Sequence, residues 1–193
     1  MNNPLIIAVD AMGGDDSPNK VIDGISIHSN KSQNIFYKIF GNENLINPII
    51  KRNKISTDRY EVIHTDKLVE GKDTALSAAK KGKDTSLWLA IDSLKKNEAH
   101  AIVSAGNTGA LFLISKLNLK MIENIDKPAL SALWPSKKEM SVVLDLGANI
   151  ECSSKNLIDF SIMGGALHKV LFTTEKPKVA LLNIDSEELK GNA

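Results

Sequence analysis

The chain has 193 residues, enough for one compact domain with a hydrophobic core of its own. Lysine and arginine number 24 and aspartate and glutamate 23, so the formal net charge is +1. A charge so close to zero argues against a nucleic-acid binder, which needs a strongly basic face. The single cysteine, Cys152, can form no intrachain disulfide, so we expect a reducing cytoplasm as the compartment.

The opening segment, MNNPLIIAVD, has no basic n-region, and its short apolar run ends in Asp10. No apolar stretch approaches the roughly 20 residues that a membrane-spanning helix needs. We therefore expect any membrane contact to be peripheral or to occur through a partner.

In the first half of the chain, short apolar runs alternate with helical patterns. The runs LIIAV (5–9), FYKIF (36–40) and YEVIHT (60–65) predict buried strands. Ser17 and Pro18 resemble an N-cap followed by proline at the first helical position, and a second helix is expected after Gly41. Residues 67–83 are polar and predict a loop with one helical turn. Asp84 is the expected cap of a helix over TSLWLAIDSLKKN.

The second half continues with a strand at AHAIVSA (99–105) and a helix that ends near Leu119. PALSALWP and SVVLDLG predict strands joined by a polar turn at 137–139, and KVALLNI (178–184) predicts another. A helix is expected over 156–172, with four side chains pointing inward: Ile158, Ile162, Leu167 and Leu171. The alternation predicts one α/β domain over 1–193, a mostly parallel sheet with helices on both faces.

Four turns rich in glycine, aspartate and asparagine follow the predicted strands, at residues 10–15, 104–110, 145–149 and 183–192. Ligands of open parallel sheets bind beyond the carboxyl ends of the strands, so we expect these turns to line one cleft. In SAGNTGAL the backbone N–H groups, the Thr108 hydroxyl and the Asn107 amide suit a phosphate or a developing oxyanion. The alternative is that Gly106 and Gly109 only make a tight turn.

Several familiar motifs are absent from the sequence. G-x-G-x-x-G and the P-loop are missing, so dinucleotide and nucleoside triphosphate binding have no support. The sequence also lacks H-E-x-x-H, paired cysteines and G-x-S-x-G. We interpret Cys152 as a buried thiol rather than a nucleophile. The histidines are interpreted as structural or solvated: His28, His64, His100 and His168.

Five segments in order resemble one known family: AVDAMGGD, DTSLWLAIDSLKKNEAHAIVSAGNTGAL, KPALSALWP, VVLDLGANIEC and KVALLNIDSEELKGN. From Ala8 to Asn192 the chain resembles the bacterial phosphate acyltransferases of phospholipid synthesis, the PlsX type. The resemblance implies transfer of a fatty acyl group from acyl carrier protein to inorganic phosphate. It also implies a fold like that of isocitrate and isopropylmalate dehydrogenases, without their nicotinamide cofactor or any other.

The resemblance further implies a cytoplasmic homodimer that associates peripherally with the membrane. Its acyl phosphate would feed the membrane glycerol-3-phosphate acyltransferase. Phosphate attack on a thioester needs preorganised donors rather than a metal or a protein nucleophile. An acidic carrier protein would be received by a lysine near the mouth, such as Lys80 or Lys81.

Residue type and the matching motifs together suggest the site residues. The expected catalytic residues are Lys190, as the cation that offsets phosphate charge, with Asn107 and Asn149. The expected phosphate- or substrate-binding residues are Asp10, Gly13, Gly14, Ser104, Gly106, Thr108, Gly109, Gly147 and Asn192.

Two features depart from the family pattern. Asp185 stands where the family usually has glycine, and the chain ends at Ala193 where family members continue. We therefore expect the N-terminal portion of a longer fold. One hypothesis is the acyltransferase, complete or complemented by a separate C-terminal half. The other is an inactive remnant or half of a split enzyme. The motif set argues against a phosphate acetyl- or butyryltransferase.

Overall fold

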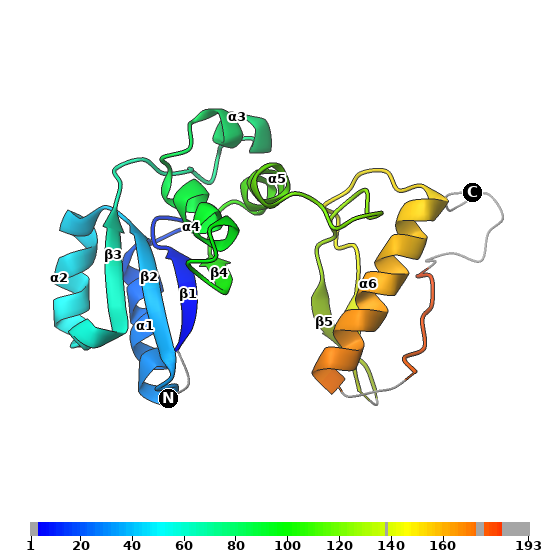
Figure 1. Ribbon diagram of the computed structural model, residues 1–193, viewed down its shortest axis with the longest axis horizontal. Helices are drawn as coiled ribbons and strands as arrows, with labels where there is room; N and C mark the ends of the chain where they lie inside the picture. Colours follow the sequence, from blue (N-terminus) through cyan, green and yellow to red (C-terminus); the bar gives the residue numbers. More distant parts are fainter. Residues whose placement is uncertain (1–3, 138, 173–175, 183–193) are drawn as a thin grey trace. The chain divides into compact units, whose positions relative to one another are not determined.

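The computed structural model describes residues 4–137, 139–172 and 176–182. Contacts divide the chain into a first unit, Met1–Met121, and a second unit, Ile122–Ala193, shown in Figure 1. Each unit is described by itself, and the expected single domain over 1–193 stays a prediction. No helix in the described part of the chain is long and apolar enough to cross a membrane.

The first unit is built on a parallel sheet of four strands in the order β3-β2-β1-β4 (Figure 1). The strands are β1 (Leu5–Asp10), β2 (Ile35–Gly41), β3 (Tyr60–His64) and β4 (Ala101–Ser104). The register of β1 and β4 pairs Asp10 with Ser104. Because parallel strands end at the same edge, the loops that follow β1 and β4 emerge side by side.

Helices cover both faces of this sheet. α1 (Asn19–Lys31) and α2 (Glu43–Asn53) lie on one face and α4 (Ser86–Lys95) on the other, with a 3₁₀ turn at Thr57–Arg59. α5 (Thr108–Leu119) packs against α4, and the short α3 (Ala75–Lys80) packs against α5. Ile39 of β2 packs in the cluster that holds Ile22 of α1 and Ile46 of α2. Its neighbour Phe40 packs in the opposite cluster with Ala90 of α4. This alternation is that of a strand buried on both faces, and it confirms the predicted α/β class. The dehydrogenase-like label stays a prediction.

Two helix starts differ from the expected ones, and one expected helical turn is present. α1 begins at Asn19, and the Ser17 hydroxyl donates to the Gly13 carbonyl at 2.6 Å instead of capping the helix. Thr85 rather than Asp84 caps α4, since the Asp84 carboxylate pairs with Lys67 at 2.7 Å. The expected helical turn within 67–83 is α3, which Thr74 caps. In each case a competing side-chain partner or a neighbouring threonine sets the boundary.

The second unit contains an antiparallel hairpin, β5 (Ala132–Pro135) with β6 (Met140–Val143), followed by α6 (Ser154–Phe172). The two strands confirm the prediction for this region, and Lys138 of the expected turn lies outside the described residues. The expectation that Ile158 and Ile162 point inward was wrong, because they are 60% and 62% exposed. Leu167 and Leu171 are exposed as well, whereas Phe160 is buried.

The predicted strand over 178–184 is also wrong where it can be checked. Residues 178–182 have no regular structure and pair with no strand among the described residues, and 183–184 lie outside them. An apolar run forms a strand only where a neighbouring strand accepts its backbone hydrogen bonds. Apolar content alone therefore misled the prediction here.

Candidate functional site

The loop after β1 and the loop after β4 touch through glycines. A Cβ atom on Gly13 would stand 2.9 Å from the backbone nitrogen of Gly106, and one on Gly106 would stand 3.0 Å from the Gly13 Cα. Gly14 has φ +88°, and a Cβ there would overlap the Ala105 carbonyl oxygen. Larger side chains would push the loops apart, so the close approach explains why glycine occupies these positions.

Asp10 ties these loops to the rest of the first unit. It is 2% exposed, and its Oδ1 accepts hydrogen bonds from the Ser86 hydroxyl at 2.7 Å and the Met12 nitrogen at 3.3 Å. Its Oδ2 accepts from the Ser104 hydroxyl at 2.8 Å, and the Gly106 N–H donates to that hydroxyl at 3.2 Å. A buried carboxylate is tolerated when donors surround it in this way.

Asn107 connects the second loop with residues 71–73. Its Oδ1 accepts from the Ala110 nitrogen at 2.9 Å and caps α5. Its Nδ2 donates to the carbonyl of Asp73 at 2.7 Å and to that of Gly71 at 3.2 Å. The side chain of Asn107 is thus engaged with backbone groups, and it fixes the first turn of the helix.

The start of α5 offers backbone donors at this edge of the sheet. Thr108 and Gly109 are its first two residues, and helical geometry leaves their N–H groups without intrahelical partners. The helix dipole adds positive character at the same end. These groups, with the Thr108 hydroxyl, are the donors that this loop can direct at an anion.

The polar segment over residues 67–84, beside this site, carries three ion pairs, one of them between Lys72 and Glu70 at 3.2 Å. Lys81 lies 2.6 Å from Asp73, and its hydrogen bond is the main reason that the pKa of Asp73 is lowered. Lys67 pairs with Asp84, as described for the start of α4. Lys80, at the end of α3, is exposed. Of the two lysines expected to receive a carrier protein, Lys81 is therefore already engaged in an ion pair.

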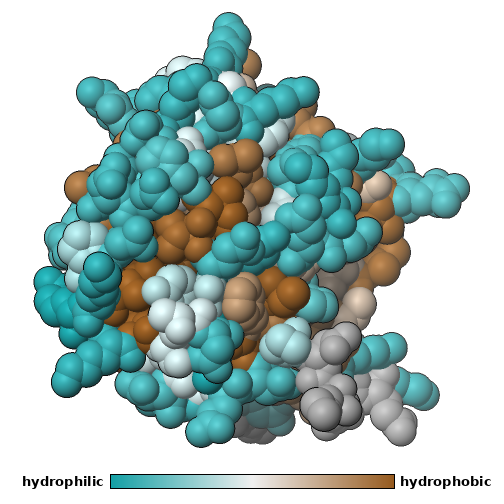
Figure 2. Space-filling model, turned by 60° about the vertical axis from the view of Figure 1, so that its left-hand side comes forward, coloured by the Kyte–Doolittle hydropathy of each residue, from teal (hydrophilic) through white to brown (hydrophobic). Residues whose placement is uncertain are grey.

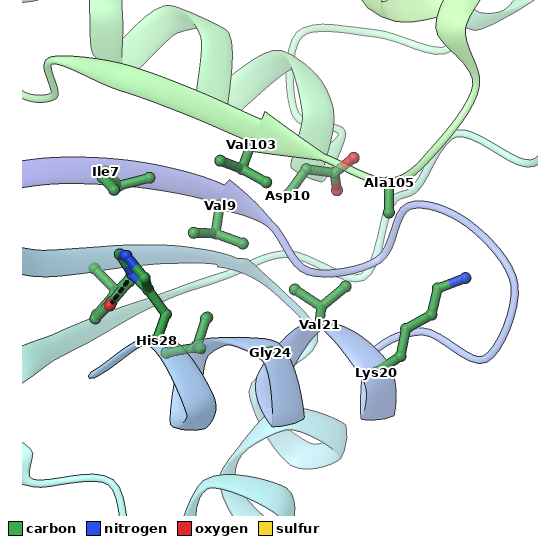
Figure 3. Close-up of a pocket in the computed structure, with 11 residues that line it drawn as sticks. Ile7, Val9, Asp10, Lys20, Val21, Gly24, His28, Val103 and Ala105 are labelled. Atoms are coloured by element: carbon green, nitrogen blue, oxygen red, sulfur yellow. Dashed lines mark hydrogen bonds between the residues drawn. The ribbon is translucent and has the colours of Figure 1, made fainter. Parts of the chain in front are cut away.

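An apolar groove of about 540 Å³ begins at the loops after β1 and β4 and runs along the sheet face that α1 borders. Figure 3 shows Val9 and Val103 on the strands facing Val21 on α1, with Asp10 and Ala105 at one end and His28 at the other. The His28 Nδ1 lies 2.8 Å from the Tyr37 hydroxyl. Val103 is 53% exposed, so the groove is open to solvent along β4. Figure 2 shows one face of the molecule, on which apolar surface lies exposed between hydrophilic residues.

The turn at residues 145–149 forms a separate network in the second unit. Asp145 accepts from the Leu130 nitrogen at 2.8 Å and from the Asn149 nitrogen at 2.7 Å. Asn149 Nδ2 also donates to the Pro128 carbonyl at 2.9 Å, and Gly147 has φ +83°. Burial raises the pKa of Asp145, but these hydrogen bonds outweigh it and hold the pKa below its usual value. Within the described residues, Asn149 stabilises this turn through its hydrogen bonds to Asp145 and to the Pro128 carbonyl.

Comparisons with known proteins agree with the fold and the motifs. A family model described as "Fatty acid synthesis protein" matches residues 5–193. The chain belongs to this family. Among curated relatives, the "Phosphate acyltransferase" of Pelagibacter ubique is 63% identical over 100% of this chain and 57% of its own length. That of Rhodospirillum rubrum is 41% identical over 99% of this chain and 55% of its own length.

The chain thus spans about half the length of the curated family members that it matches. Among solved structures, the EutD phosphotransacetylase from Staphylococcus aureus aligns with a TM-score of 0.63. The two sequences are 12% identical, and the alignment covers 89% of this chain and 55% of the phosphotransacetylase chain. Similarity at this identity establishes the α/β fold alone.

The structure brings together part of the expected site. Eight of the expected residues share one edge of the first unit: Asp10, Gly13, Gly14, Ser104, Gly106, Asn107, Thr108 and Gly109. Gly147 and Asn149 belong to the second unit, and Lys190, Asn192 and Asp185 lie outside the described residues. Ser86 was not expected. A serine at a helix start resembles an ordinary cap, so its long-range partner gave no local signal.

Proposed function

We propose that this chain provides the phosphate-binding part of a phosphate acyltransferase that uses acyl carrier protein as acyl donor. The observation that carries the proposal is the contact of two glycine-rich loops at Gly13 and Gly106, beside the first turn of α5. The name that the curated relatives share supports the same reaction class.

In the proposed reaction, a phosphate oxygen attacks the thioester carbonyl carbon, the carbon–sulfur bond breaks, and the thiolate leaves with the carrier protein. The phosphate is held by the N–H groups of Thr108 and Gly109 and by the Thr108 hydroxyl. Donors fixed before the reaction also stabilise the oxyanion of the tetrahedral intermediate. In a reaction without a protein nucleophile, this stabilisation is the main source of rate acceleration. Asn107 acts by holding the first turn of α5 in place. Its cap of that helix and its hydrogen bonds to the carbonyls of residues 71 and 73 support this role.

The remaining site residues are proposed from the family resemblance. Lys190 offsets the charge of the phosphate, and Asn192, Asn149 and Gly147 help to position the substrates. The exposed Lys80 suits the acidic surface of a carrier protein. The proposal includes a cytoplasmic homodimer at the inner face of the membrane, whose acyl phosphate feeds the membrane glycerol-3-phosphate acyltransferase.

The test uses a chimera in which this chain replaces the matching 57% of the Pelagibacter ubique relative. Long-chain acyl carrier protein is supplied, and release of the carrier thiol is followed with and without phosphate. We expect phosphate-dependent release that Thr108→Val reduces by about 100- to 1,000-fold through loss of one donor. Lys54→Gln, on the surface beyond α2, is the control and should leave the rate unchanged.

A folded chimera without phosphate-dependent release would contradict the proposal and favour the remnant. Release that continues without phosphate would contradict it as well, because the anion site would then have no part in the reaction. The same assay of the 193-residue chain alone shows whether it acts by itself or as half of a split enzyme.

A further inference from the structure

A buried hydroxyl on α4 reaches the proposed site without lying in any of its loops. Ser86 is the first residue of α4 and is 1% exposed. Its Oγ donates to Asp10 Oδ1 at 2.7 Å, across 76 residues of sequence. Thr85, not Ser86, provides the cap of this helix, so local helix chemistry does not account for a buried serine at this position.

The hydrogen bonds continue from Asp10 into the second glycine-rich loop. The other carboxylate oxygen of Asp10 accepts from Ser104, and the Ser104 hydroxyl accepts from the Gly106 N–H. Ser86, Asp10, Ser104 and Gly106 therefore form an unbroken series that starts on α4, passes through the end of β1 and ends after β4. Such a series polarises along its length and is sensitive to loss of any member.

Close packing makes the position of the Asp10 carboxylate important for both loops. A Cβ atom on Gly13 would lie 2.6 Å from Asp10 Oδ2, so the first loop passes directly over the carboxylate. The second loop touches the same glycine through Gly106. A carboxylate that loses one donor shifts toward the remaining donors. Because both loops are closely packed around the Asp10 carboxylate, such a shift displaces both of them.

We propose that Ser86 is a positioning residue: by holding Asp10 it sets the placement of the two glycine-rich loops, residues 13–14 and 104–106. The consequence for phosphate rests on the proposed function, whereas the placement of the loops does not. Ser86 itself touches no substrate and acts through Asp10 and Ser104.

The test compares Ser86→Ala with Ser93→Ala in the 193-residue chain. Ser93 is a matched control, because it is a buried serine of the same helix whose hydroxyl donates to the Ala90 carbonyl at 2.7 Å. Amide hydrogen exchange is measured at Gly106 and at buried α2 residues such as Ile50. We expect about five- to tenfold faster exchange at Gly106 in Ser86→Ala, with α2 unchanged. Ser93→Ala should leave Gly106 as in the unmodified chain.

A double-mutant cycle separates positioning from general stability. Ser86 and Ser104 both donate to Asp10, and the Met12 N–H donates to the same carboxylate. Ser86→Ala with Ser104→Ala should therefore change Met12 exchange by a factor different from the product of the single effects. Multiplicative effects would overturn the proposal. Equal Gly106 exchange in the two serine variants would overturn it too, as would uniform acceleration that includes α2.

A phosphate titration of the same variants tests the proposed function separately. Weaker phosphate binding in Ser86→Ala, with normal binding in Ser93→Ala, supports both proposals. If the unmodified chain binds no phosphate, the proposed anion site fails, while the exchange result still decides the role of Ser86.

Discussion

The backbones of Gly13 and Gly106 are in direct contact, although the two residues lie in loops that follow different strands. Asp10 and Ser104, paired in register and hydrogen-bonded at 2.8 Å, fix the strand ends from which these loops emerge. The sheet register and the glycine contact together place the first turn of α5 beside the loop after β1.

Replacing Gly13 by alanine should destabilise the first unit. The new Cβ would stand 2.6 Å from Asp10 Oδ2 and 2.9 Å from the Gly106 nitrogen. Such overpacking lowers the free energy of unfolding by about 1–3 kcal/mol, which urea denaturation measures. Gly24→Ala in α1 is the control, because nothing lies within 4 Å of its Cβ position. It should instead raise stability by about 0.5–1 kcal/mol. Equal stabilities of the two variants would contradict the close contact.

Asn107→Ala should remove the cap of α5 and also release the segment at residues 71–73. Loss of the cap lowers the free energy of unfolding by about 1 kcal/mol. Asn42→Ala, which removes the cap of α2, should have a similar effect on stability but leaves Gly71 and Asp73 tied to Asn107. Trypsin should therefore cleave after the exposed Lys72 faster in Asn107→Ala only. The same cleavage rate in both variants would show that Asn107 does not hold this segment.

The turn at Asp145 should lose stability in acid. The pKa of Asp145 is lowered from the usual 3.8, so the unfolded chain binds a proton more readily than the folded one. Its stabilising contribution is therefore present above that usual value and is lost as the pH falls through the lower folded pKa. The amide signals of Leu130 and Asn149 should report this transition, and Asp145→Asn should abolish it. Persistence of the transition in Asp145→Asn would assign it to another group.

The two sides of α6 should respond differently to substitution. Phe160 is 4% exposed, so Phe160→Ala should lower the free energy of unfolding of the second unit by about 3–5 kcal/mol. Ile162 is 62% exposed, and Ile162→Gln should change it by less than about 0.5 kcal/mol. Thermal unfolding followed by circular dichroism measures both. A large cost for Ile162→Gln would mean that this side of the helix is covered in solution.

The sequence was a good guide where the determinants of structure were local. Apolar runs at 5–9 and 36–40 predicted β1 and β2 because strands buried on both faces need apolar residues throughout. Glycine clusters after these strands and after β4 predicted loops that a backbone can approach closely, and Gly13 and Gly106 do so.

Contacts between residues that lie far apart in the chain could not be predicted from the sequence. The bond between Ser86 and Asp10 depends on the placement of α4 over the end of β1, which no local pattern encodes. α6 carries apolar residues on more than one side, so its periodicity could not identify Phe160 rather than Ile162 as buried. The run at 178–182 lacks a described partner strand, a requirement that the sequence does not display.

A phosphate titration of the 193-residue chain, followed by its amide NMR signals, tests the phosphate site most directly. We predict saturable shifts concentrated at Gly13, Gly106, Thr108 and Gly109, and none when chloride replaces phosphate at equal ionic strength. Shifts that do not saturate, or that spread over exposed lysines such as Lys80 and leave the glycine-rich loops unchanged, would contradict a phosphate site at the start of α5.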